Sequence, residues 1–388
     1  MRIGVDATCW HNRRGYGRHA RGLLSALVPL DRTCRYTLFL DSEAPAQDLP
    51  PGCEVRVLKP AVPTVEAASA NGHRSLGDMW RMSRALSAKE FDVILFPTIY
   101  SYVPAFSRAR KLVMVHDVIA DTYPGMTVPR RAARFLWSAK GRIGRMQADA
   151  LVTVSDYSRA EILRRFRFDT SRIFVVGEAP DAVFRRLDHP VPDPKLRAAG
   201  IDPSRRMVVY LGGFSPHKNL EALLAAFARI AMREEFRDVQ LVMVGATSGD
   251  AFHSYYGTLA AQVEALNLRD RVIFTGYLDD EQLVVLLNIA SLLALPSLME
   301  GYGLPAVEAA ACGCPVVATN ASPLAGLLGE AGLFIDPNEA SIASALETVL
   351  GSEDLRMRMR QSGLDAARRL TWERAAQQMI GVIRTVCT

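Results

Sequence analysis

The sequence lacks the features that mark a membrane-spanning, secreted or disulfide-stabilised protein. No apolar run approaches the roughly 18 residues of a membrane helix, and Met1 leads into a strand-like segment without a charged-then-apolar leader. The 6 cysteines are scattered, and the C-x-C pair Cys312 and Cys314 does not have a usual zinc or redox spacing. We therefore expect reduced thiols and a cytoplasmic protein, either free or peripheral at the inner face of the membrane.

Neither sign of charge dominates the whole chain, whose net charge is +5 with 49% hydrophobic and 22% charged residues. These values are typical of a soluble globular protein. A length of 388 residues exceeds what one core usually supports, so two domains are expected. Locally the balance differs, because residues 128–172 contain 11 basic and 4 acidic side chains. No aromatic interleaving or known motif accompanies this charge, so we expect no nucleic-acid partner.

Within that basic region, Pro129–Met146 has the periodicity of an amphipathic helix. Such a helix can lie against an anionic membrane surface. Equally, its apolar face can pack on a sheet while its arginines face solvent, the interpretation that we favour. The apolar face would consist of Ala132, Phe135, Leu136, Ala139, Ile143 and Met146.

Two series of alternating strand and helix patterns predict an α/β protein with two doubly wound parallel sheets. The segment Glu178–Pro203 contains 5 prolines and no convincing strand, which indicates a linker between the two series. We expect one domain over residues 1–182, a second over 183–370 and a terminal helix over 371–388. Residues 60–75 lack periodicity and predict a mobile loop over a cleft. The first series of strands is expected at Arg2–Ala7, Tyr36–Leu40, Glu54–Leu58, Asp92–Phe96, Lys111–His116, Ala150–Val154 and Arg172–Val176.

The most informative stretch runs from Leu295 to Val317, a strand end, a glycine-containing loop, a helix and the next strand. A helix is expected to open near Gly303, and its exposed N-terminus would suit a phosphate. Two carboxylates, Glu300 and Glu308, flank this place. Carboxylates suit a phosphate ligand poorly unless they bind hydroxyls of the same molecule. A nucleotide sugar offers diphosphate and hydroxyls together.

Three further motifs follow strands. Gly15–Arg18 (G-Y-G-R) opens the first helix, where glycines permit a tight turn or close approach of an anion. In Leu211–Asn219, Lys218 places a cation where diphosphate charge must be neutralised, and Asn219 or Ser215 is expected to cap the next helix. His116 ends a strand, where its side chain is expected to point into a cleft.

Together these motifs resemble the retaining glycosyltransferases of family 4, in particular their mannosyltransferase members. The match rests on Glu300 and Glu308, eight residues apart with G-Y-G-L-P between them, and on A-A-A-C-G-C-P-V-V-A behind. The resemblance implies the GT-B fold, with two Rossmann-like domains facing a cleft and the last helix crossing back onto the first domain. It also implies transfer of a hexose from a nucleotide diphosphate sugar to a glycan or lipid-linked acceptor. No aspartate pair is placed as an obvious metal site, so we expect no metal and no cofactor.

The resemblance assigns roles residue by residue. His116, Lys218 and Glu300 would be the catalytic residues, with His116 on the transferred sugar and Asp117 supporting its loop. The acceptor side would include Gly15, Tyr16 and Arg18. The donor would be contacted by Gly17, Gly213, His217, Lys218, Tyr277, Leu278, Glu300, Gly301, Tyr302, Gly303, Leu304 and Glu308, with Glu300 on sugar hydroxyls and Glu308 on the ribose.

The chain departs from the family pattern at two places. Gly213 stands where many members have an arginine, so His217 would supply the second hydrogen-bond donor to the phosphates. Ala325-Gly326 stands where many members have a Pro-Glu pair. The motifs H-K-N and V-S-D-Y-S-R resemble mannosyltransferases and favour GDP-mannose, although a UDP- or dTDP-sugar remains an alternative.

Two other classes of protein remain open. A dinucleotide oxidoreductase would use the Gly15 loop and Asp41, which ends the second strand where an acidic ribose ligand belongs. That class leaves Lys218, Glu300 and Glu308 unexplained. A non-enzymatic sugar-nucleotide-binding or membrane-scaffold protein would bind ligand without turnover.

Overall fold

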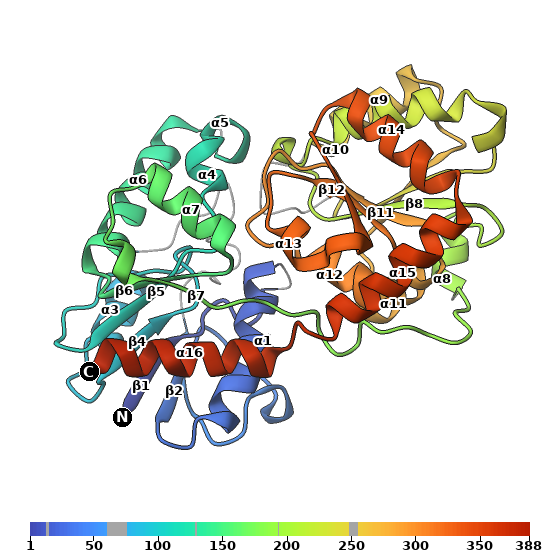
Figure 1. The fold of residues 1–388 in the computed structure, drawn as a ribbon. Coiled ribbons are helices and arrows are strands. Elements are labelled where there is room, and N and C mark those ends of the chain that lie inside the picture. Colours follow the sequence, from blue (N-terminus) through green and yellow to red (C-terminus); the bar gives the residue numbers. More distant parts are fainter. Residues whose placement is uncertain (13–14, 60–75, 129, 193, 248–254) are drawn as a thin grey trace. The chain divides into compact units, whose positions relative to one another are not determined.

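A computed structural model describes residues 1–12, 15–59, 76–128, 130–192, 194–247 and 255–388 (Figure 1). The loop expected over 60–75 lies outside these ranges. The chain forms two compact units, the first of residues 1–178 and 371–388 and the second of residues 179–370. The first boundary between the units thus lies at residues 178–179, whereas the prolines led us to expect it at residues 182–183. All six cysteines are free thiols. None of the helices in the described ranges is both long and apolar enough to cross a membrane.

Unit 1 is built on a seven-stranded parallel sheet with the order β3-β2-β1-β4-β5-β6-β7. Its central strands are buried on both faces, as their continuous apolar runs predict. The strands are β1 (Arg2–Asp6), β2 (Arg35–Leu40), β3 (Glu54–Val57), β4 (Val93–Phe96), β5 (Arg110–Met114), β6 (Ala150–Thr153) and β7 (Ile173–Val175). The helices are α1 (Gly15–Leu30), α3 (Leu76–Leu86), α4 (Ile119–Thr122), α5 (Pro124–Thr127), α6 (Arg131–Gln147), α7 (Asp156–Arg165) and α16 (Trp372–Cys387).

Unit 2 has a six-stranded parallel sheet with the order β10-β9-β8-β11-β12-β13. The strands are β8 (Met207–Leu211), β9 (Gln240–Val244), β10 (Val272–Gly276), β11 (Leu292–Leu295), β12 (Val316–Thr319) and β13 (Gly332–Ile335). The helices are α8 (Pro194–Ala198), α9 (Leu220–Ala231), α10 (Tyr256–Ala265), α11 (Asp280–Ile289), α12 (Leu304–Ala311), α13 (Leu324–Leu328), α14 (Glu339–Leu350) and α15 (Glu353–Ala367). The predicted fold class, two parallel α/β sheets, is confirmed.

The terminal helix α16 joins the first unit, as predicted, and packs beside α1 (Figure 1). Buried side chains of both helices, such as Leu24 and Met379, share one core with the central strands. Gly22 permits this packing, because a Cβ there would lie 2.3 Å from the Trp372 ring. At the end of β7, the Gly177 N–H donates to Gln378 Oε1 at 3.0 Å. The terminal helix is therefore tied to a strand end of unit 1.

Each sheet reverses its strand order at one place, between β1 and β4 in unit 1 and between β8 and β11 in unit 2. Open parallel sheets bind ligands outside the carboxyl ends of their strands at such a switch point. The loops that follow β1, β4, β8 and β11 are therefore the places to look for functional side chains.

Candidate active site

Lys218 and Glu300 meet at the switch point of unit 2, in the loops that follow β8 and β11. Lys218 Nζ donates to Glu300 Oε1 at 2.7 Å, and Ser297 Oγ donates to the same oxygen at 2.6 Å. Burial alone would raise the pKa of Glu300, but Lys218 and Ser297 outweigh it and hold that pKa below its usual value. The site therefore contains an ionised carboxylate and its ammonium partner, both largely buried.

The backbone at Asn219 gives this loop its shape. Asn219 adopts the left-handed conformation, with φ of 58°, which asparagine tolerates better than most residues. Asn219 is the N-cap residue of α9, as expected, and Ser215 precedes the short 3-10 turn Pro216–Lys218, but neither side chain makes a capping hydrogen bond among the described residues. Asn219 Nδ2 instead donates to the carbonyls of Pro296 and Pro337 at 3.1 and 2.8 Å. It thereby ties together the loops after β8, β11 and β13.

His217 is neutral in this loop. Burial and the neighbouring Lys218 charge lower the pKa of His217 to about 3, against a smaller opposing effect of Glu300. Its buried Nδ1 has no hydrogen-bond partner among the described residues. A neutral imidazole can still donate one N–H, so Lys218 carries the charge and His217 can add a hydrogen bond.

The loop from Glu300 to α12 depends on Gly303. Gly303 has φ of 90°, and a Cβ there would lie 2.9 Å from the Leu324 side chain. Pro305 follows in the first turn of α12, where its missing N–H costs nothing. Glu308 lies on α12, and this glutamate is 4% exposed. Gly301, Tyr302 and Leu304 are buried beside this turn.

The remaining donor-side residues lie on neighbouring loops of unit 2. After β10, Tyr277 is 56% exposed whereas Leu278 is buried. After β8, the Gly213 carbonyl accepts a 2.7 Å hydrogen bond from the Tyr210 hydroxyl. Ala325 and Gly326, which stand in place of the Pro-Glu pair, lie on α13.

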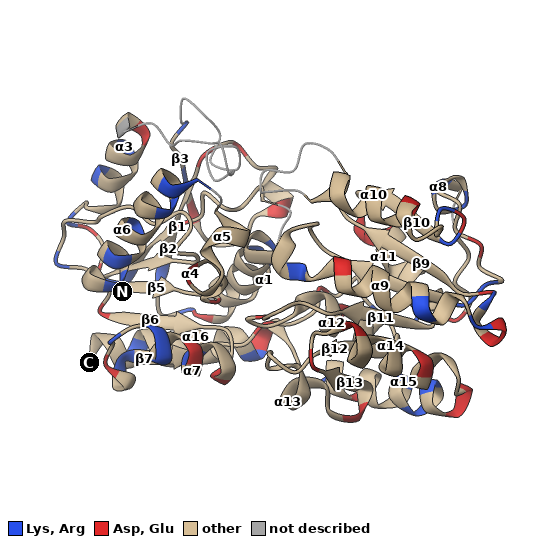
Figure 2. Cartoon of the chain, turned by 90° about the horizontal axis from the view of Figure 1, so that it is seen from above, with Lys and Arg blue, Asp and Glu red and all other residues tan. Residues whose placement is uncertain are grey.

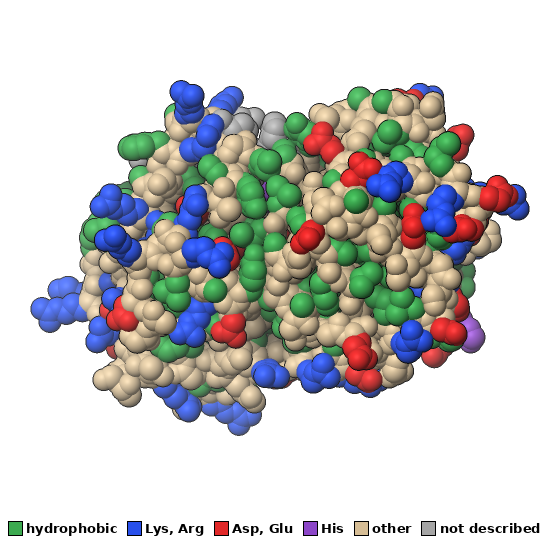
Figure 3. All heavy atoms as spheres, turned by 45° about the horizontal axis from the view of Figure 1, so that its top comes forward, with side chains coloured by type: hydrophobic (Ala, Val, Ile, Leu, Met, Phe, Trp, Pro, Cys, Tyr) green, Lys and Arg blue, Asp and Glu red, His purple; other side chains and the backbone are tan. Residues whose placement is uncertain are grey.

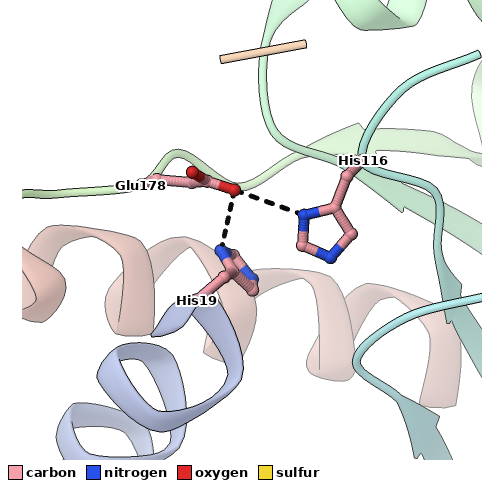
Figure 4. Close-up of side chains that lie close together, drawn as sticks. All are labelled: His19, His116 and Glu178. Atoms are coloured by element: carbon pink, nitrogen blue, oxygen red, sulfur yellow. Dashed lines mark hydrogen bonds and ion pairs between the residues drawn. The ribbon is translucent and has the colours of Figure 1, made fainter. Parts of the chain in front are cut away.

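A second cluster lies in unit 1, where His116 meets Glu178 and His19 (Figure 4). His116 Nδ1 lies 3.3 Å from Glu178 Oε1, and His116 Nε2 lies 2.8 Å from the Pro97 carbonyl oxygen. His19 Nδ1 lies 3.1 Å from the same Glu178 oxygen. Within the described part of the chain His19 has no well-aligned hydrogen bond, so this second contact is close but poorly directed. The cluster joins α1 to the segments that follow β4, β5 and β7.

The charges in this cluster follow from its geometry. Burial would raise the pKa of Glu178, but the contacts with His116 and His19 outweigh burial and hold it at about 2. Burial lowers the pKa of His19, whereas for His116 the Glu178 carboxylate, the Pro97 carbonyl and Asp117 outweigh burial and raise it. Glu178 is therefore ionised, and His116 is the histidine that can share its proton.

The Gly15–Arg18 segment forms the first turn of α1. Gly17 is required there, because a Cβ would lie 2.0 Å from the Asn12 carbonyl oxygen. The Tyr16 ring stacks on Tyr100 at 5.3 Å between centroids, and Tyr100 stacks on Trp137 of α6 at 4.9 Å. A row of stacked rings thus joins the expected acceptor side to the basic helix α6.

The favoured interpretation of that helix was wrong, because its apolar side chains do not pack on the sheet. Phe135 is 73% exposed, Leu136 58%, Ile143 43% and Met146 75%. The buried residues of α6 are Gly141 and Gly144, and at Gly144 the helix lies against Ile99 and Tyr102. The helix therefore presents apolar side chains and arginines to solvent together.

Basic side chains gather over much of unit 1 in the space-filling view (Figure 3). The cartoon shows basic positions around β7 and α7, with acidic positions among them at α7, and α15 of unit 2 also carries both signs (Figure 2). The charge imbalance noted for residues 128–172 is thus a surface property of unit 1.

Sequence reasoning missed Glu178 and His19. From the sequence, Glu178 was recognised only as the start of the proline-rich linker. Its position just after a predicted strand, like that of His116, was the available signal, because carboxyl ends of parallel strands share one edge of a sheet. For His19, inside a predicted helix, no signal in the sequence distinguished it from an ordinary core residue.

Two family models match consecutive parts of the chain. Residues 14–178 match the glycosyl transferase 4-like domain, and residues 193–365 match glycosyl transferases group 1. The chain is 30% identical to a D-inositol 3-phosphate glycosyltransferase of Corynebacterium efficiens, over 60% of this chain and 55% of that protein. It is also 30% identical to O-antigen chain mannosyltransferase B of Escherichia coli, over 61% of each. The chain thus spans less than two thirds of either relative.

The fold is shared along the whole chain with solved structures. Sucrose-phosphate synthase from Thermosynechococcus elongatus matches with a TM-score of 0.76 and 20% identity, over 100% of this chain and 99% of that one. HepE of Anabaena, solved with UDP-glucose, matches with a TM-score of 0.75 and 17% identity, over 99% of both chains. The protein has the GT-B fold of two parallel-sheet domains. With both family models matched, it belongs to the group 1 glycosyl transferases.

Proposed function

We propose that this chain transfers a hexose from a nucleotide diphosphate sugar to an acceptor hydroxyl, with retention of the anomeric configuration. The contact between Lys218 and Glu300 at the switch point of unit 2 carries this proposal. The ammonium supplies the charge that a departing diphosphate needs, and the carboxylate supplies acceptors for sugar hydroxyls. Preorganised charge of this kind usually lowers the barrier of an enzymatic reaction more than any other single effect. Membership of the family argues against a dinucleotide oxidoreductase.

The mechanism we propose avoids a covalent sugar–enzyme intermediate. A two-step retaining route needs a carboxylate nucleophile under the sugar. Glu300 is poorly suited to that role, because Lys218 and Ser297 both donate to its Oε1. In our proposal the leaving phosphate takes the proton of the acceptor hydroxyl, which attacks from the same face of the sugar. Glu300 then holds sugar hydroxyls, Glu308 the ribose and His116 the transferred sugar.

Transfer is proposed to proceed without a metal ion. Lys218 places one positive charge on the loop, neutral His217 can add a hydrogen bond, and helix N-termini favour anions. These groups can neutralise a diphosphate through hydrogen bonds and charge. Activity in excess chelator is the expected outcome.

GDP-mannose is the donor we propose first. The H-K-N and V-S-D-Y-S-R motifs support it, and so does the match to an O-antigen chain mannosyltransferase. A UDP-sugar is the alternative favoured by the fold of HepE, which was solved with UDP-glucose. Calorimetric titration of the protein with GDP, UDP and dTDP distinguishes these bases. Tightest binding of GDP supports the proposal, and tightest binding of UDP or dTDP replaces it with the alternative.

The acceptor is proposed to be presented at an anionic membrane surface. Exposed Phe135 and Met146 on α6 can enter the headgroup region while neighbouring Arg131 and Arg142, also exposed, face lipid phosphates. The stacked Tyr16, Tyr100 and Trp137 rings connect this surface to the expected acceptor side. A lipid-linked acceptor would arrive at that surface.

A further inference from the structure

The second cluster, His19–His116–Glu178, contains two buried ionisable side chains besides His116, and the expected role of His116 does not account for them. Each of the three residues is at most 9% exposed. Burial of an ionised carboxylate is costly unless a partner compensates it. Glu178 was assigned no role from the sequence, so its place in the cluster needs an explanation.

The hydrogen bond to Pro97 determines which nitrogen of His116 carries a proton. A carbonyl oxygen only accepts hydrogen bonds, so the His116 Nε2 that lies 2.8 Å from Pro97 O carries a proton. A neutral His116 would then direct the Nδ1 lone pair at Glu178 Oε1, 3.3 Å away, which is repulsive. Protonation of Nδ1 converts this contact into a charge-assisted hydrogen bond.

His19 is the neutral member of the cluster. It is completely buried, and its ring lies edge-on to His116 at 4.6 Å between centroids and to Trp372 at 5.5 Å. Two imidazolium rings at that separation would repel each other, so one buried carboxylate supports one charged histidine. His19 therefore packs against the His116 ring and the Glu178 carboxylate, and Trp372 packs against His19.

The terminal helix holds the remaining side of the cluster. Gln378 of α16 accepts from the N–H of Gly177, the residue before Glu178. Trp372, at the first turn of the same helix, contacts His19. The return of α16 to unit 1 thus supports the segment that carries Glu178.

We propose that Glu178 is a positioning residue that keeps His116 in its imidazolium form at the carboxyl end of β5, with His19 and α16 holding the pair in place. This deepens the proposed function and rests on it, because His116 is expected to act on the donor sugar. Both His116 nitrogens have protein partners, so His116 would offer a ligand its charge rather than a free N–H. The charged groups that face His116 are Glu178 and Asp117, and neutral His19 completes its surroundings.

Nuclear magnetic resonance titration of the histidine rings tests the charge without any substrate. The His116 signals are assigned by their loss in His116→Gln. In Glu178→Gln the titration midpoint of His116 is expected to fall by about one pH unit or more, because an opposite charge that close favours the charged form. Glu54→Gln, which removes a carboxylate 57% exposed on β3, is the matched control and should leave the midpoint unchanged. An unchanged midpoint in Glu178→Gln overturns the proposal.

A matched pair of glutamines tests the positioning. Gln378→Ala removes the partner of Gly177, whereas Gln377→Ala changes the preceding, exposed residue of α16. Gln378→Ala should lower kcat about tenfold with little change in KM for the donor, since losing one hydrogen bond to the segment misplaces a catalytic group. Equal kcat values for the two variants would overturn the role of α16.

Two outcomes separate this inference from the proposed function. If the midpoint falls in Glu178→Gln but no nucleotide sugar is turned over, the function fails while the charge assignment stands. Titration with Zn²⁺ alone covers the other explanation of a His–His–Glu cluster. Micromolar Zn²⁺ binding that is lost in both Glu178→Gln and His19→Asn would show that a metal, not a proton, joins these side chains.

Discussion

Replacing Lys218 by methionine separates the structural from the catalytic contribution of the Lys218–Glu300 pair. Methionine keeps most of the side-chain volume but leaves the buried Glu300 carboxylate without its cation. Removing one partner of a buried pair costs about 3–5 kcal/mol, and we expect the lower end because the Lys218 side chain keeps 20% exposure. Separately, loss of one charge-assisted contact to the donor should raise the activation free energy of transfer by about 1.5–3 kcal/mol, roughly one to two decades in rate.

The double variant Lys218→Met with Glu300→Gln makes the distinction. It removes both charges, so no unpaired carboxylate stays buried. Most of the free energy of unfolding that is lost in Lys218→Met should therefore return. Transfer activity should stay at least as low as in the single variant, because the donor has lost both partners. Stability is measured by thermal unfolding and activity by release of nucleoside diphosphate. Lys195→Met, on exposed α8, is the control. Recovery of transfer in the double variant would refute a catalytic role for the pair.

Three further outcomes are expected. Turnover should persist in excess EDTA, and rescue of a chelated enzyme by Mg²⁺ or Mn²⁺ would contradict the metal-free proposal. Sedimentation with anionic vesicles should weaken in Phe135→Ser/Met146→Ser and at high salt, since screening shortens the attraction to about 10 Å or less; Met232→Ser, 88% exposed on unit 2, should bind as wild type. Glu178 stabilises the fold above its ordinary pKa of 4.5, and this contribution is lost as pH falls toward about 2. The difference in Tm between wild type and Glu178→Gln should therefore shrink over that range, and a constant difference would argue against the ion pair.

The fold followed from the sequence because local patterns determine it. Apolar runs such as those of β4 and β9, bounded by turn residues, favour strands covered on both faces, and Pro305 and Gly303 favour a helix start by their backbone preferences. The resemblance placed Lys218 and Glu300 in one site, and their direct contact required the strand order, which sets β8 beside β11.

Other features could not be obtained from local patterns. The contact of Glu178 with His116 spans 62 positions, and no periodicity encodes it. The exposure of Phe135 depends on Gly141 and Gly144 being the side of α6 that faces the protein. An amphipathic pattern fixes two faces of a helix but does not tell which one is buried. Asparagine is a residue type that often caps helices with its side chain. The Asn219 side chain instead donates hydrogen bonds to the carbonyls of Pro296 and Pro337.

The central claim is retaining transfer of a hexose from a nucleotide sugar, and stereochemically resolved turnover tests it most directly. GDP-mannose, UDP-glucose and dTDP-glucose, all α-linked, are incubated with the protein, and the first-formed sugar or glycoside is followed by proton magnetic resonance. Retention predicts an α-configured first product from one of these donors and a rate at least tenfold lower in Glu300→Gln. A β-configured first product, or turnover unchanged in Glu300→Gln, would contradict it.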